Sequence, residues 1–392
     1  MNYEFPDDLV ALRSRLRSRI TETFPDGFPT IFTEDPQPLA ASHEFCRQLG
    51  SEGTLTIAWP AEYGGENASL WAQLVVAEEM WAHNEPRGGQ YYGSNWIGPT
   101  IMKYGSDAQK EQHLKAIAAG DGRWAQGYSE PDAGSDLASL RLRAERVTDG
   151  WKLSGQKIWT SYGDYAQWII LLARTSAEGD KHDGITVFLL PMDREGIEVR
   201  PIKNITGPHD FNEVFFDNVY AADSEVLGQP DRGWEVARTS LGFERVGNPR
   251  WARVERLLTE VRAACLDGDG ASGTEPDPGL VARWVEAALG CRVARLVHYK
   301  TIAEREAADG SDVSPLRSSV FRAINTANDQ RVMDVLVDCV GPAAWFGHGE
   351  QDAVLGAEIQ HEWRMSRTAT VAAGTYEVQQ MVIAKETLAG KR

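Results

Sequence analysis

The order of the periodic patterns constrains this chain more than any single motif, because helical patterns at both ends enclose a β-rich middle. Near the N-terminus apolar residues recur at helical spacing, as at Leu9, Leu12 and Leu16. Between residues 151 and 220, short β-rich runs alternate apolar and polar residues and are separated by Gly and Asp clusters. From Trp234 onward the spacing is helical again, except for a polar segment at 267–279 that predicts a surface loop.

This order predicts an α+β protein that is mostly helical. We expect a helical domain at 1–121, an antiparallel β-barrel domain at 122–230 and a helical bundle at 231–392. The chain has 392 residues, which is long enough for a large core and for three such parts.

Composition argues against several classes of function. The formal net charge of −17 disfavours a nucleic-acid-binding surface. The four cysteines are far apart and form no CxxC pair, so we expect inert thiols and neither a metal centre nor a disulfide framework. The N-terminus carries Asp7 and Asp8 and lacks the apolar core of a signal peptide, and no run of about 18 apolar residues predicts a membrane span. We therefore expect a cytoplasmic protein with no metal ion, nucleic acid or membrane partner.

The densest motif is GYSEPDAGSDLAS, Gly127–Ser139. Its small residues let backbone N–H groups approach a ligand closely, and Ser129 and Ser135 add hydroxyl donors. Such a loop suits a phosphate or the polar edge of a ring, but the same composition also fits a plain turn between domains.

Two further motifs leave similar alternatives open. In GQKIWTS, Gly155–Ser161, Trp159 offers a flat surface and Ser161 a hydroxyl on the same face of a predicted strand. The pair could cover a cofactor ring, but a core tryptophan explains the same pattern. Near the C-terminus, Gly374 and Thr375 open a predicted helix whose N-terminus suits pyrophosphate or is simply capped.

Together and in this order, the motifs resemble the acyl-CoA dehydrogenase family. SEPDAGSD is close to the family's S-E-P-x-A-G-S-D signature, QKIWTS is similar to its flavin-covering strand, and GTYEVQ resembles its G-T-S-E-I-Q ending. The resemblance covers roughly residues 5–390 and implies a C-terminal four-helix bundle and bound FAD. It also implies oxidation of an acyl-CoA thioester to the 2-enoyl-CoA, in which a carboxylate takes the α-proton and flavin N5 the β-hydride.

The resemblance implies roles for individual residues as well. Contacts to FAD fall on Gln126, Tyr128, Ser129, Ser135, Trp159, Ser161, Thr375 and Glu377. The electron acceptor it implies is an electron-transfer flavoprotein.

Ala373 is the main departure from the family. The best-known members carry the catalytic Glu just before the Gly-Thr pair, where an alanine cannot accept a proton. Another branch places that Glu in an E-R pair on a bundle helix, a position matched here by Glu244 and Arg245. We therefore predict Glu244 as the base, Arg245 as a residue directed toward CoA or the bundle, and the Ala373 N–H as a donor to the thioester carbonyl.

The Arg-x-x-Phe-Gly segment, which many members extend to a neighbour's FAD, is not recognisable in this sequence. The chain thus resembles a divergent branch that includes subunits of heterotetramers, several of them in steroid side-chain degradation. We expect either a homotetramer or an α2β2 heterotetramer with a related subunit. Two alternatives stay open: a flavin monooxygenase or oxidase on the same fold, and a non-catalytic partner subunit.

Overall fold

The computed structural model describes residues 5–33, 35–207, 211–265, 277–308, 310, 313–347, 350–351 and 353–389. They pack into two compact units, which we call the sheet unit (residues up to Val76, and Glu85–Glu244) and the bundle unit (Ala77–Asn84, and Arg245 onward). The loop expected at 267–279 lies mostly outside the described residues. The expected domain boundaries at 121 and 230 stay predictions.

Helices come first in the sheet unit. α1 (Asp7–Thr23) buries Leu9, Leu12, Leu16 and Ile20, which confirms the helical spacing in the sequence. The helices that follow are α2 (Pro36–Ser51), the first half of α3 (Leu70–Ala82), α4 (Gln90–Tyr92), a π-helical turn (Gly93–Ile97), α5 (Gly98–Tyr104) and α6 (Asp107–Ala118).

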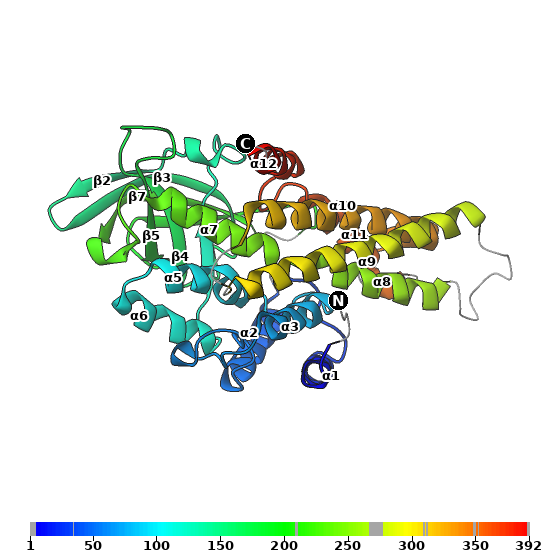
Figure 1. Ribbon diagram of the computed structural model, residues 1–392. Coiled ribbons are helices and arrows are strands. Elements are labelled where there is room, and N and C mark those ends of the chain that lie inside the picture. Colours follow the sequence, from blue (N-terminus) through cyan, green and yellow to red (C-terminus); the bar gives the residue numbers. More distant parts are fainter. Residues whose placement is uncertain are drawn as a thin grey trace. The chain divides into compact units, whose positions relative to one another are not determined.

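One eight-stranded sheet completes the sheet unit (Figure 1). Its strands are β1 (Trp124–Gly127), β2 (Arg143–Val147), β3 (Gly150–Ser161), β4 (Trp168–Arg174), β5 (Ile185–Pro191), β6 (Ile197–Ile202), β7 (Phe211–Ala222) and β8 (Val226–Leu227). They lie in the order β6-β7-β3-β2-β4-β5-β8, and β1 pairs with β4. Most pairs are antiparallel, whereas β1 and β2 each run parallel to β4.

The sheet is not the closed barrel that we expected. Among the described strands, β6 and β8 stand at the two ends of the strand order and do not pair with each other, so the sheet stays open. β6 carries Pro201, which has no N–H to donate, together with the charged Glu198 and Arg200, and such residues protect an exposed edge from further pairing. β8 has only two residues, which limits pairing at the other edge.

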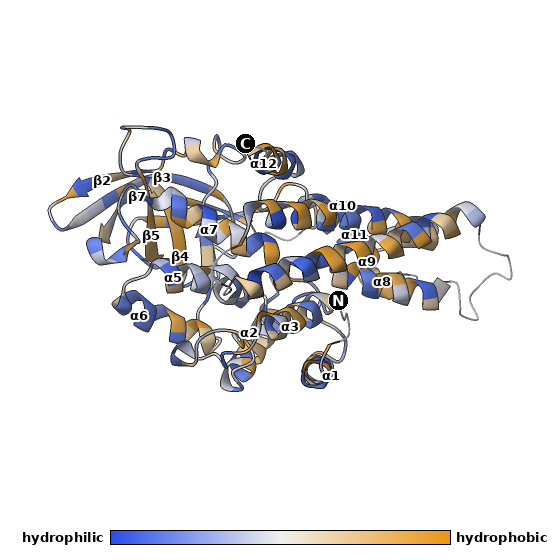
Figure 2. Ribbon diagram, viewed as in Figure 1, coloured by the Kyte–Doolittle hydropathy of each residue, from blue (hydrophilic) through white to orange (hydrophobic). Residues whose placement is uncertain are grey.

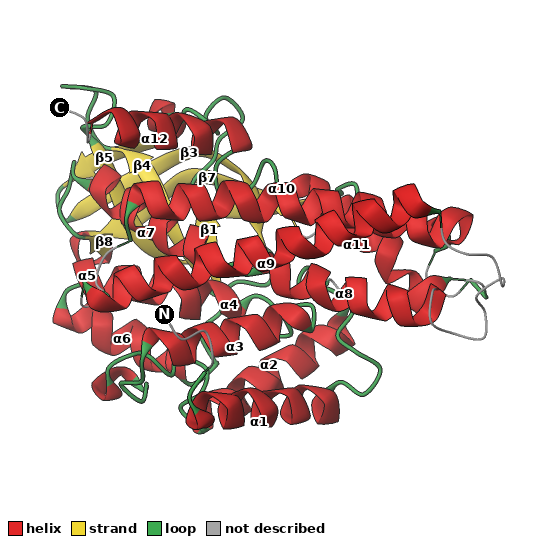
Figure 3. Ribbon diagram, turned by 45° about the vertical axis from the view of Figure 1, so that its right-hand side comes forward, coloured by secondary structure: helices red, strands yellow, loops and turns green. Residues whose placement is uncertain are grey.

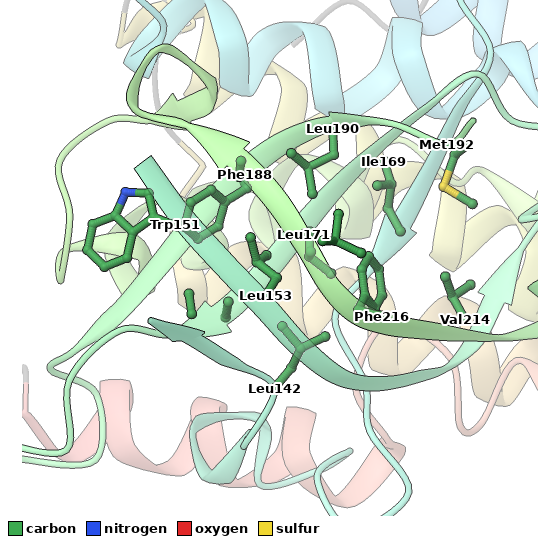
Figure 4. Packing of buried hydrophobic residues seen from close by; sticks show 14 of the residues in the cluster. Leu142, Trp151, Leu153, Ile169, Leu171, Phe188, Leu190, Met192, Val214 and Phe216 are labelled. Carbon is green, nitrogen blue, oxygen red and sulfur yellow. The ribbon is translucent and has the colours of Figure 1, made fainter. Parts of the chain in front are cut away.

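Apolar strands form the core of the sheet unit. Figure 2 shows β4 and β5 as mostly apolar, and nearly all of their residues are buried. Figure 4 shows Leu153, Ile169, Leu171 and Phe188 in this core, where each has 0% exposed surface. Burial of one such side chain contributes about 1.5–3 kcal/mol. The core thereby holds β1 and β3, the strands that carry two of the predicted motifs.

In the described part of the chain, the bundle unit contains the ends of α3 and α7 (Gly233–Val246) and five further helices (Figures 1 and 3). These are α8 (Arg250–Cys265), α9 (Pro278–Ala307), α10 (Pro315–Val340), α11 (Glu358–Thr368) and α12 (Tyr376–Ala389). α10 is central, because it packs against each of the other four. α9 and α10 both begin with proline at the first helical position, preceded by Asp277 and Ser314 as side-chain caps.

Charged residues are buried in the core of the bundle unit. Arg253 on α8 donates to Asp329 on α10 at 3.0 Å and lies 2.5 Å from a carboxylate oxygen of Glu362 on α11. All three side chains are at most 2% exposed. Burial raises the pKa of Glu362, but Arg253, His361 and Arg250 together outweigh this effect and lower that pKa to about 2. The cluster therefore links three helices through charges that depend on one another.

No helix in the described ranges combines the length and the apolar composition needed to cross a membrane. In the same part of the chain, no three His, Cys, Asp or Glu side chains are grouped so that they could hold a metal ion. Cys46 and Cys291 are buried free thiols, and Cys339 is a partly buried one.

Candidate active site

The predicted flavin loop begins at the end of β1. Gln126 Oε1 accepts a hydrogen bond from Trp96 Nε1 at 2.8 Å, which orients the side chain and leaves its NH2 group to donate elsewhere. Tyr128 is buried, Ser129 is partly buried and Ser135 is exposed. The polar side chains of this loop therefore range from buried to exposed.

A buried ion pair joins this loop to the second motif. Lys157 Nζ on β3 donates to Glu130 Oε1 at 2.8 Å and to the Tyr128 carbonyl at 3.1 Å, and the two charged side chains are 0% and 8% exposed. The Glu130 carboxylate also accepts the backbone N–H groups of Arg141 and Leu142 at 2.6 and 2.8 Å. Burial lowers the pKa of Lys157 to about 8, against the opposing effect of Glu130. The pair thus fixes the loop backbone at Tyr128.

Trp159 lies at an irregularity of β3. The register against β7 shifts between Lys157 and Thr160, and Trp159 itself has a φ of +61°. This left-handed backbone is uncommon for a bulky residue and turns the indole outward, so that 56% of the residue is exposed. Trp159 is therefore not a core tryptophan. Ser161, two residues on, is 8% exposed, and a role for both residues against a flavin stays a prediction.

Glu244 lies near the end of α7 and is half-buried. Burial raises the pKa of two tyrosines, Tyr91 and Tyr128. The negative charge of Glu244 raises both pKa values further, so its carboxylate lies near both hydroxyl groups. Ser240, one helical turn before Glu244, is near enough to the Tyr128 hydroxyl to lower its pKa. Within the sheet unit, the predicted base thus lies close to a residue of the predicted flavin loop.

The remaining predicted residues belong to the bundle unit. Arg245 Nε donates to the Ala373 carbonyl at 3.5 Å, so this side chain is directed into the bundle unit. Thr375 Oγ1 accepts the N–H of Val378 at 3.3 Å and caps α12, one of the two alternatives that the sequence left open, and its contact with FAD stays a prediction. Glu377 is exposed in the first turn of the same helix.

An open cavity of about 770 Å³ lies beside that first turn, within the bundle unit. Its lining residues are Arg283, Glu286, Thr326, Ala327, Gln330, Arg331, Asp334, Val335, Thr370, Tyr376 and Glu377. Charges of both signs line it, and Arg283 is paired with Asp338 at 2.6 Å. A polar ligand held at the start of α12 would lie in or beside this cavity.

The residues of the sheet unit fit a flat ring with a polar edge. Trp159 presents an exposed aromatic face, and the Gln126 amide and the Ser161 hydroxyl supply donors. At Gly134 a Cβ would meet nothing within 4 Å, so the loop backbone is open to a ligand there. At Gly127, by contrast, a Cβ would lie 2.7 Å from Ile169 Cδ1, so that glycine is explained by packing against β4. A half-buried carboxylate nearby adds a proton acceptor to this arrangement.

Comparison with known families is decisive. Models of the acyl-CoA dehydrogenase N-terminal, middle and C-terminal domains match residues 9–121, 125–219 and 231–388. The chain belongs to the acyl-CoA dehydrogenase family. The acyl-CoA dehydrogenase IpdE1 of Mycolicibacterium smegmatis is 32% identical over 358 residues, which cover 87% of this chain and 86% of the relative. This chain is accordingly an acyl-CoA dehydrogenase, an oxidoreductase of a flavoprotein family.

Solved structures confirm the fold and the steroid-related branch. A structure described as the Tcur3481-Tcur3483 steroid ACAD matches with a TM-score of 0.88 and 30% identity, over 99% of this chain and 99% of that one. The ChsE4-ChsE5 complex from Mycobacterium tuberculosis matches with a TM-score of 0.86 and 29% identity, again over 99% of both chains. This acyl-CoA dehydrogenase is therefore similar to subunits that were solved in complexes of two different chains.

Sequence reasoning missed the residues that hold the site residues in place. Lys157 and Glu130 were both inside quoted motifs, but nothing in either motif indicated that the two side chains pair. Ser240 stands four residues before Glu244, and this helical spacing was the only available signal for it. In the bundle unit, Gln379 is the last residue of the quoted GTYEVQ motif, but nothing in that motif indicated what its side chain holds, and Arg322 had no signal at all.

Proposed function

We propose that this acyl-CoA dehydrogenase uses FAD to convert an acyl-CoA thioester to the 2-enoyl-CoA, with Glu244 as the base that takes the α-proton. The observation that carries this proposal is the position of Glu244, half-buried on α7 and close to Tyr128 of the flavin loop. A carboxylate that is partly withdrawn from water is a stronger base than a fully solvated one.

The other site residues bind the flavin and orient the thioester. Trp159 covers one face of the flavin ring, and the Gln126 amide, the Ser129 region and the Ser161 hydroxyl meet its polar edge. The Ala373 N–H donates to the thioester carbonyl, which stabilises the negative charge that develops when the α-proton leaves. FAD held by these residues would supply the acceptor for the hydride from the β-carbon. We propose an electron-transfer flavoprotein in the cytoplasm as the subsequent acceptor.

We further propose that the acyl group is bulky, of the steroid side-chain class. The support is the likeness to the structure described as a steroid ACAD, at 30% identity over nearly the whole chain. Gly242 and Gly247, on either side of Glu244 in the sequence, carry no side chain that would take space from such a group.

We propose a related but different subunit as the partner, and α9 as part of the surface that it covers. α9 buries Ala287, Cys291 and Ala294 on one face. Five large aliphatic residues on the opposite face are 43–56% exposed: Val281, Val285, Leu289, Val293 and Leu296. A helix that is apolar on both faces is suited to contacts on both, and the similar chains were solved as two-chain complexes.

The partner proposal is tested by isolating the tagged protein from its source cells and analysing it by native mass spectrometry. The wild type should carry a second acyl-CoA dehydrogenase chain, identified by its peptides, in equal amount. Leu289→Asp should lose that chain, whereas Val10→Asp, at a 49% exposed position on α1, should keep it. Retention of the partner by Leu289→Asp would exclude this surface.

The reaction is tested by assaying the purified protein or complex with straight-chain, branched and steroid side-chain acyl-CoAs in an anaerobic dye-reduction assay, with flavin content recorded. Reduction by at least one acyl-CoA, and most rapidly by the bulky ones, is the expected result. Flavin that is reduced only by a nicotinamide cofactor, with consumption of oxygen, would favour a monooxygenase. A complex that turns over with all of its flavin in the partner chain would make this chain a non-catalytic subunit.

A further inference from the structure

The turn that carries Ala373 has an uncommon backbone. Ala373 has a φ of +56° and Gly374 a φ of +89°, between the end of α11 and the start of α12. A left-handed conformation is unfavourable for alanine, and it persists only where the surrounding structure imposes it. The source of that constraint lies in the side chains that hold the carbonyl groups of the turn.

Two buried side chains bind these carbonyls. Arg322 Nη2 on α10 donates to the carbonyls of Ala369 and Ala372, both at 2.9 Å. Gln379 Nε2 on α12 donates to the carbonyls of Ala373 and Gly374, at 3.2 and 3.1 Å. Arg322 is 2% exposed and Gln379 1% exposed, so both donors are shielded from water.

Because a peptide unit is planar, a side chain that holds its carbonyl group also fixes the direction of its N–H group. The Ala372 carbonyl and the Ala373 N–H belong to one rigid trans peptide unit and point in opposite directions. Because Arg322 holds the carbonyl, the N–H is directed away from Arg322, and among the described residues it has no acceptor. Gln379 holds the next two peptide units and prevents the turn from rotating as a whole.

Gly374 leaves the space that this arrangement needs. A Cβ at Gly374 would lie 2.7 Å from Gln379 Nε2, so a larger residue would displace the amide that holds the turn. The positive φ of Gly374 adds a conformational reason for glycine at the same position.

We propose that Arg322, assisted by Gln379, is a positioning residue for the thioester: it holds the peptide unit whose Ala373 N–H donates to the thioester carbonyl. This inference rests on the proposed function. Neither residue touches substrate in this account, and both act through the backbone. A fixed donor stabilises developing charge better than one that must reorient during the reaction.

The test uses the flavin-loaded protein, with its partner if it has one, and the 2-enoyl-CoA product labelled with ¹³C at the thioester carbonyl. Isotope-edited infrared spectroscopy measures the stretching frequency of that carbonyl, which falls when a hydrogen bond polarises it. The wild type should lower the frequency relative to free product. Arg322→Met and Gln379→Leu should each lose part of this shift, so that the frequency moves back toward that of free product. Each should also lower kcat roughly 10- to 100-fold with little change in KM, since a lost oxyanion donor costs about 100- to 1000-fold. Arg322→Lys should recover part of the loss.

The control is Gln109→Leu. Gln109 is a buried residue of the sheet unit whose Nε2 likewise donates to two carbonyls, of Ser224 and Val226, both at 2.9 Å. It should lower thermal stability but leave the carbonyl frequency unchanged. If Gln379→Leu and Arg322→Met lower stability as Gln109→Leu does but keep the wild-type frequency and kcat, Arg322 and Gln379 have only a structural role and the inference is wrong. A wild type that binds the product without any shift would instead count against the proposed donor itself.

Discussion

The sheet unit and the bundle unit both bury charged side chains, but they use them differently. In the sheet unit, Lys157 and Glu130 connect the two motifs that we propose to bind flavin, and they fix the loop backbone at Tyr128. In the bundle unit, Arg253 and Asp329 are part of a cluster that connects three helices. The difference shows that a buried ion pair can fix the backbone of one loop in one region and hold several helices together in another. Similar substitutions in the two units should therefore have different consequences.

The largest effect on stability is expected for Asp329→Ala. This change leaves Arg250 and Arg253 without a carboxylate that now lies 3.4 and 3.0 Å from them, and breaking such a buried pair costs about 3–5 kcal/mol. Chemical denaturation measures the loss. Asp338→Ala on the same helix is the control, because it breaks a pair with Arg283 that is about half exposed and should cost about 0–1 kcal/mol. Equal losses of unfolding free energy in the two variants would show that the buried cluster does not stabilise the bundle unit more than an exposed ion pair does.

Lys157→Met should combine a smaller loss of stability with a loss of flavin. The change leaves the Glu130 carboxylate buried with only backbone partners, at a cost of about 1–3 kcal/mol. It also frees the Tyr128 carbonyl, so flavin content should fall by more than the fraction of unfolded protein explains. The measurements are denaturation of the flavin-free protein and absorbance of the purified one. Lys152→Met, at an exposed position on the same strand, should change neither, and normal flavin content in Lys157→Met would contradict the role of the pair.

Acid should weaken the bundle unit through His298. Burial lowers the pKa of His298 to about 3, whereas an unfolded histidine titrates near 6.5. The unfolded state therefore takes up a proton first, and stability is lost as the pH falls below about 6.5, by roughly 2 kcal/mol at pH 5 for this group. His298→Phe should flatten the pH dependence in that window, and hydrogen exchange should place the change in the bundle unit. His182→Phe, at a partly exposed position, is the control; an unaltered slope in His298→Phe would exclude the buried histidine as the cause.

The smallest effect on stability is expected for Trp159→Ala. Because 56% of this residue is exposed, the flavin-free protein should lose at most about 0.5 kcal/mol, as at other surface positions. Flavin retention should nevertheless fall strongly, which thermal unfolding with and without added FAD would reveal. Trp151→Ala, in the core of the same unit at 7% exposure, should show the reverse, with a large loss of stability even without flavin. Equal losses for the two tryptophans would argue against a ligand-facing Trp159.

The elements of this fold were predictable because their signals are local. Leu9 and Leu12 lie at helical spacing, and Thr375 stands where a helix cap belongs, so short windows of sequence were enough. Open edges were not predictable, since the choice between a barrel and a sheet depends on whether β6 finds a partner far away in the chain.

The motifs of the site could be predicted from the sequence, but the side chains that hold these motifs in place could not. Trp159 faces outward because of a register shift against β7, which no local pattern encodes. Lys157 and Glu130 meet across 27 residues, and Arg322 reaches Ala372 across 50, so only the folded chain brings them together. The resemblance to the family supplied the residues that we propose to face ligands, whereas the structure identified the side chains that hold their backbone in place.

The most direct test of the central claim is anaerobic mixing of Glu244→Gln with the best acyl-CoA substrate. Glutamine has nearly the same shape as glutamate but cannot accept the α-proton, and general-base catalysis contributes about 100- to 10,000-fold. The variant should bind FAD as the wild type does, and its flavin should bleach slower by at least about 100-fold. Bleaching at a near-normal rate in a variant with full flavin content would show that Glu244 is not the base.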